Sequence, residues 1–78
     1  MDHAEAWENL KRAAKGGVAL GDLERLVEEW VESLPSEMKR LALGCFLLGV
    51  TDVKDLPKRF REDATFRALF IEFLKSLP

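Results

Sequence analysis

The stretch DLERLVEEWVESL, residues 22–34, sets apolar side chains three and four positions apart, with charged side chains between them. One helical face collects the apolar residues Leu23, Leu26, Val27, Trp30 and Leu34. Another face collects the acids Glu24, Glu28 and Glu32. A period of 3.6 residues is typical of an amphipathic helix that buries one side, and Pro35 ends it. The stretch therefore predicts a core-facing helix over about 22–34.

Helical spacing continues on both sides of this stretch, and no segment alternates apolar and polar residues as a strand does. We therefore expect an all-α fold, a compact bundle within a single domain, residues 1–78. Its four main helices are predicted at about 2–15, 22–34, 36–50 and 64–77, with a short helical segment near 52–60.

Local signals set the ends of these helices. Asp2 and Asp63 precede helical runs and are residue types that cap helix N-termini. Gly16 and Gly17 follow the first run, where a helix commonly stops. Pro57 is compatible with a helix only in its first turn, or else with a bend.

The segment LALGCFLLGV, residues 41–50, is apolar on every side of the expected helix 36–50. Such a helix has to be covered all round. We expect it to be the central element, or to have one side covered by a second chain. Its ten residues fall well below the roughly 20 that a membrane-spanning helix needs, so no membrane crossing is expected.

The composition is that of an ordinary globular protein, with 47% hydrophobic and 33% charged residues. The net charge of -2 argues against a polycation that coats nucleic acid or membranes by charge alone. A single cysteine excludes an internal disulfide framework. With no secretion signal in the first residues, the lone thiol predicts a cytoplasmic protein.

The chain contains no Gln, and Asn9 is its only Asn. Depletion of these thermolabile amides is typical of proteins from thermophiles, which predicts such a source. A GC-rich genome explains the same bias equally well.

No set of residues predicts catalysis. A nucleophilic pair would need Cys45 beside His3, but the neighbours of Cys45 are apolar, and burial suppresses the reactivity of a thiol. One His and one Cys cannot supply the ligands of a zinc site, and no acidic run has calcium-loop spacing. We expect no enzyme activity, no metal, no cofactor and no small-molecule substrate.

Charge is divided unevenly along the chain. Residues 1–35 carry eight acids and four bases, whereas residues 36–78 carry six acids and eight bases. The densest basic cluster surrounds Pro57 and consists of Lys54, Lys58, Arg59 and Arg61. This cluster is either a solvated segment that partly neutralises the negative charge of the helix 22–34, or a patch that binds phosphates or an acidic partner. The second interpretation predicts a nucleic-acid-binding regulator, the alternative function.

The chain carries more large apolar side chains than a small helical core is expected to enclose, and a contiguous excess usually marks an interface. We therefore predict a non-enzymatic helical interaction module, either a homodimer or a small accessory subunit of a larger assembly. The residues expected to anchor the partner through an apolar helix face are Leu43, Leu47, Phe70 and Ile71.

Residues 23–35 (LERLVEEWVESLP) resemble residues 66–78 (FRALFIEFLKSLP) at an offset of 43 positions. That offset lies in the range of two-helix repeats, which predicts a duplicated hairpin. Amphipathic helices also share leucines by necessity, so the alternative is chance similarity.

Overall fold

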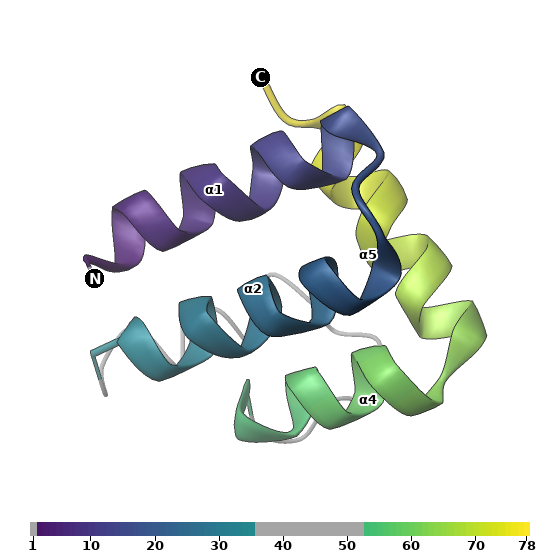
Figure 1. The fold of residues 1–78 in the computed structure, drawn as a ribbon. Coiled ribbons are helices and arrows are strands. Elements are labelled where there is room, and N and C mark those ends of the chain that lie inside the picture. The colour runs from purple at the N-terminus through teal and green to yellow at the C-terminus, as the bar shows by residue number, and fades with distance from the viewer. Residues whose placement is uncertain (1, 36–52) are drawn as a thin grey trace.

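A computed structural model of the chain describes residues 2–35 and 53–78, and these residues are mostly helical (Figure 1). The helices are α1 (His3–Gly16), α2 (Leu20–Ser33), α4 (Leu56–Glu62) and α5 (Ala64–Ser76), and the 3-10 turn η1 (Val53–Asp55) leads into α4. The described part of the chain contains no strand, which confirms the all-α fold class. The helix expected at 36–50 lies outside the described residues.

Three helices lie side by side and the fourth crosses their ends (Figure 1). α1 packs along α2, and α4 packs along the other side of α2 in the antiparallel direction. α5 crosses from α1 to α4 and packs against both. The inner face of α5 therefore covers the core at the end of the layer, between α1 and α4.

The core is one apolar cluster to which every described helix contributes. Its buried members are Ala6, Leu10, Ala14, Leu23, Val27, Trp30, Val31, Leu34, Val53, Leu56, Phe60, Phe66, Phe70 and Leu74. Aromatic pairs tie the elements together, since the rings of Trp7 and Trp30 join α1 to α2 at 4.8 Å and those of Phe60 and Phe70 join α4 to α5 at 5.8 Å. In the described residues no polar or charged side chain is buried.

The helix ends follow the local signals with small shifts. α1 ends at Gly16, and Gly17 adopts the left-handed conformation (φ 70°) that glycine tolerates best. Asp2 occupies the N-cap position, but its side chain makes no capping hydrogen bond. α2 begins at Leu20, two residues before the expected start, and Asp22 lies within its first turn.

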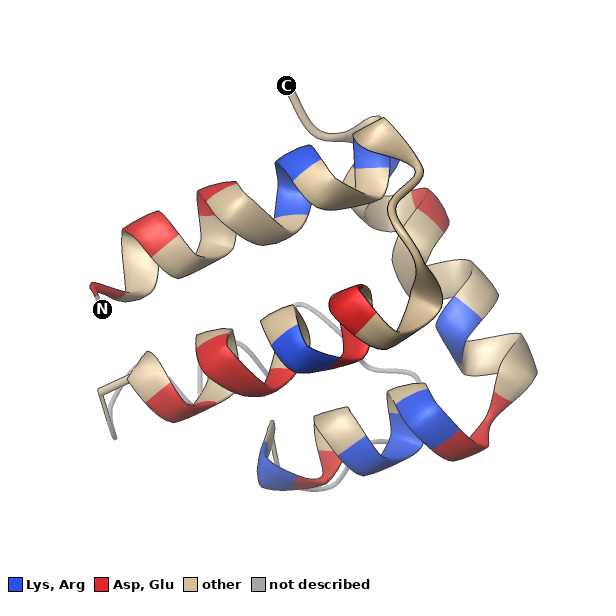
Figure 2. Ribbon diagram, viewed as in Figure 1, with Lys and Arg blue, Asp and Glu red and all other residues tan. Residues whose placement is uncertain are grey.

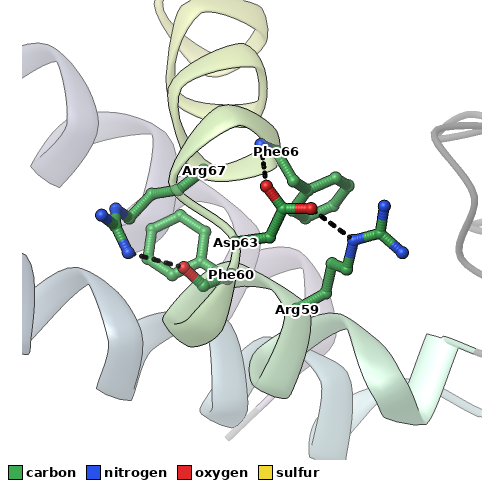
Figure 3. Close-up of polar contacts among 5 residues, drawn as sticks. All are labelled: Arg59, Phe60, Asp63, Phe66 and Arg67. Carbon is green, nitrogen blue, oxygen red and sulfur yellow. Dashed lines mark hydrogen bonds and ion pairs between the residues drawn. The ribbon is translucent and has the colours of Figure 1, made fainter.

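The turn from α4 to α5 is organised by Asp63 and two arginines (Figure 3). Asp63 caps α5 as predicted, because its carboxylate accepts a hydrogen bond of 3.0 Å from the backbone N–H of Phe66. Arg59 donates to the other carboxylate oxygen at 3.0 Å, and its guanidinium lies 5.6 Å from the centre of the Phe66 ring. Arg67 donates to the carbonyl oxygens of Phe60 and Arg61, which the end of α4 would otherwise leave unsatisfied.

The Asp63 cap makes stability depend on pH. The hydrogen bond from the Phe66 N–H, followed by the charge of Arg59, lowers the pKa of Asp63 below its ordinary value of 3.8. A carboxyl whose pKa is lower in the folded state stabilises the fold above its unfolded pKa, and this contribution is lost as the pH falls through the folded pKa. We therefore expect Asp63→Ala to lower the melting temperature at pH 7, and the gap between wild type and variant to narrow below pH 3.8.

Thermal unfolding followed by circular dichroism, at pH 7 and below pH 3.8, tests this expectation. Asp22→Ala is the matched control, because Asp22 is an exposed acid within the first turn of α2 and is not the cap residue of that helix. A gap between wild type and Asp63→Ala that stays constant with pH would show that the carboxylate charge of Asp63 does not contribute.

The two segments that resemble each other in sequence end their helices in the same way. Ser33 donates to the carbonyl oxygen of Trp30 at 2.7 Å, and Ser76 donates to that of Phe73 at 2.6 Å. The next residues, Leu34 and Leu77, are both extended C-caps whose N–H groups bond three residues back at 3.3 Å. This shared ending follows from the common Ser-Leu-Pro sequence, and the duplication itself stays a prediction.

Candidate functional site

A groove between α2 and the segment formed by η1 and α4 is the hollow to which the basic cluster contributes. Its volume is about 510 Å³, and it is open to solvent. The described residues that line it are Glu28, Val31, Glu32, Lys54, Pro57, Lys58 and Arg61. Figure 2 shows the pattern along these helices, with acids prominent on α2 and bases on α4.

The four predicted basic residues do not share one surface. Lys54, Lys58 and Arg61 lie at 3- or 4-residue spacing and line the groove. Arg59 lies outside the groove lining, where it pairs with Asp63 and covers the Phe66 ring. The helical turn of 3.6 residues separates Arg59 from its neighbours, because adjacent positions on a helix point about 100° apart.

Carboxylates lie among the groove bases. Arg61 pairs with Glu28 at 3.1 Å across the groove, and both side chains remain about half exposed. Glu32 lines the same groove. A surface that tracks a phosphate backbone gains from uninterrupted positive charge, and acids within it oppose that gain. The geometry gives the nucleic-acid alternative no added support, and it stays a prediction.

The structure corrects one of the predicted apolar anchors. Phe70 is only 1% exposed, because it packs in the core against Phe60 and Phe66, and it is therefore not presented to a partner. Ile71 is partly buried against the same core. Leu43 and Leu47 lie in the part of the chain that the structure does not describe.

Different residues of α5 face the solvent. Leu69 is 50% exposed and Phe73, one turn later, is 36% exposed; we call this pair the apolar flank of α5. The sequence pattern indicated Phe70 and Ile71 of this helix as anchors and did not single out Leu69 or Phe73. Val18 and Leu20, where α1 turns into α2, are the other large apolar residues exposed in the described segments.

The described residues show no candidate metal site. They contain no group of three or more His, Cys, Asp and Glu side chains that could hold a metal ion. His3 is the first residue of α1, and Cys45 falls outside the described segments. None of the described helices has the length and apolar character to cross a membrane.

Comparisons with family models, with curated proteins and with solved structures found no match to this chain. The chain's own surfaces, the groove and the apolar flank of α5, are therefore the candidates for its function.

Proposed function

We propose that this chain is a non-enzymatic helical interaction module, acting as a homodimer or as a small accessory subunit, and that it binds through the apolar flank of α5. The observation that supports this proposal is the exposure of Leu69 and Phe73 on a helix whose other face is core. The two side chains are neighbours, because residues four apart lie one above the other on a helix.

The surroundings of the flank suit a close protein contact. Fully burying one exposed Leu or Phe contributes about 1.5–3 kcal/mol, and Leu69 and Phe73 are already half or more covered. The flank alone thus falls short of the roughly 8 kcal/mol of a micromolar complex. Thr65 and Ala68 are exposed beside Leu69 and are small, so a partner can approach the α5 backbone and bury additional surface.

Replacing Leu69 by lysine tests the proposal. We expect Leu69→Lys to reduce partner binding by roughly tenfold or more, because a hot-spot side chain is lost and a charge is placed in an apolar contact. The measurement is the amount of each protein that co-purifies from the native host with wild type and with variant, together with sedimentation of the purified chain.

The matched control is Ala4→Lys, which makes the same change of charge at an exposed position of α1. A partner that is retained by Ala4→Lys and lost by Leu69→Lys supports the flank as the binding surface. Equal recovery with both variants, or a wild type that neither self-associates nor binds any protein, contradicts the proposal.

A further inference from the structure

The groove between α2 and α4 has two walls of opposite charge. Glu28 and Glu32 lie on the α2 wall, and Lys54, Lys58 and Arg61 lie on the opposite wall. α4 runs antiparallel to α2 (Figure 1), acids are prominent on α2 and bases on α4 (Figure 2), and Arg61 of α4 pairs with Glu28 of α2. The groove is therefore an acidic stripe beside a basic stripe.

Within the described residues, one ion pair joins the two walls of the groove. Arg61 reaches Glu28 at 3.1 Å. One turn further along, α2 presents Glu32 and α4 presents Lys58. Both are exposed, and neither has a hydrogen bond or ion pair in the described part of the chain. One carboxylate and one ammonium group in the groove thus remain available to a partner.

We propose that a second copy of this chain docks on the α2–α4 groove, with the two-fold axis running along the groove. A rotation of 180° about such an axis places α2 of each copy over α4 of the other. Each acidic stripe then faces a basic stripe, and Glu32 of each copy meets Lys58 of the other. This arrangement satisfies the self-complementarity that a symmetric dimer interface requires.

The alternative axis, perpendicular to the helices, would set α2 over α2 and α4 over α4. Like charges would then face each other, which costs free energy and disfavours that pairing. The charges of the groove therefore select one orientation of the second copy.

The rest of the groove is compatible with close approach. Pro57, which is partly exposed, lines it and supplies apolar contact, whereas Val31 lines it as a core residue that is 5% exposed. A standard interface buries about 800 Å² per partner, which is about one sixth of the 4818 Å² accessible surface of this chain. One face of a compact molecule offers an area of that order. Because the charged groups are exposed, the dimer is expected to be weak and sensitive to salt.

This inference uses a surface distinct from the apolar flank of α5 and does not depend on the proposed function. Its test is sedimentation equilibrium of the purified chain with the charge reversals Glu32→Lys and Lys58→Glu. Glu32 lies in the last turn of α2 and Lys58 in the first turn of α4. Each reversal agrees with the dipole of its helix, so both variants are expected to fold.

We expect wild type to dimerise in a concentration-dependent manner and to weaken at about 1 M salt, where the Debye length is about 3 Å. Each single reversal sets like charges together at two symmetric positions, and should raise the dissociation constant about tenfold or more. An equimolar mixture of the two variants pairs Lys with Glu at both positions and should form a heterodimer. The double variant should recover the homodimer for the same reason.

Glu72→Lys and Lys75→Glu are the controls, because they reverse exposed charges on α5 without changing the groove. They should leave dimerisation unchanged. A wild type that stays monomeric at every concentration overturns the inference, as does a dimer that the groove reversals leave intact. A dimer that is lost with Leu69→Lys and kept with Glu32→Lys would support the apolar flank and reject the groove.

Discussion

Replacing Phe60 by alanine is expected to lower the free energy of unfolding by about 3–5 kcal/mol, the usual cost of removing a buried aromatic ring. Phe60 is fully buried, and its ring packs edge to face against Phe70 at 5.8 Å. It is one of the contacts between the seven-residue helix α4 and α5. Truncation removes this contact and leaves a cavity between the two helices.

The size of the domain makes this effect large. Stabilities of about 0.05–0.15 kcal/mol per residue correspond to about 4–12 kcal/mol for a chain of this length. A loss of about 3–5 kcal/mol is therefore about a quarter of that stability or more. We expect Phe60→Ala to be partly unfolded at 37 °C or to melt well below wild type.

Urea unfolding followed by circular dichroism and by tryptophan fluorescence measures the change. Phe60→Leu keeps most of the apolar volume and should retain a measurable transition if the alanine variant fails to fold. Glu62→Ala is the control, because Glu62 is an exposed residue at the end of the same helix. An unchanged urea midpoint for Phe60→Ala would mean that the ring contributes nothing to the core.

The helix ends could be predicted because they depend on neighbours along the chain. Gly17 supplies a left-handed conformation that other residues avoid. Pro57 fits the first turn of α4, where its missing N–H has no helical partner to lose. Asp63 reaches the Phe66 N–H only three residues away. Each of these interactions is complete within a few residues and needs no knowledge of the tertiary fold.

The rotation of α5 about its own axis could not be predicted in this way. Five residues of this helix form an arc of about 140°, which is wider than the part that one packing partner covers: Phe66, Leu69, Phe70, Phe73 and Leu74. The structure buries Phe66, Phe70 and Leu74 along one edge of the arc and exposes Leu69 and Phe73 along the other. The edge that faces inward is decided by the positions of α1 and α4, which local periodicity does not contain.

The pairing of the basic cluster also depends on tertiary structure. The sequence identifies the bases around Pro57 as a group, but it does not show that Arg61 pairs with Glu28, which is 33 positions away. Opposite charges lie beside each other only because α4 packs antiparallel to α2. The basic residues that are neighbours in the sequence thus form one wall of the groove, and acidic residues of α2 form the opposite wall.

Substituting two leucines of α5 in turn measures which side of this helix faces the core. Leu74 is 0% exposed, whereas Leu69 is 50% exposed. The substitutions Leu74→Ala and Leu69→Ala remove the same atoms from the same helix, so their difference isolates burial. We expect Leu74→Ala to cost about 2–5 kcal/mol through lost apolar burial and a cavity. Leu69→Ala should cost no more than about 1 kcal/mol, partly offset by the higher helix propensity of alanine.

Urea unfolding of the two variants under identical conditions gives both values. A large difference between the two costs shows that the core covers the edge of the apolar arc that contains Leu74, and that Leu69 is exposed to solvent. Equal costs would mean that Leu69 is buried too, which would remove the structural basis of the apolar flank. If Leu69→Ala is nearly neutral in stability while Leu69→Lys abolishes binding, the loss of binding belongs to the contact with the partner, because the fold that presents the flank is intact.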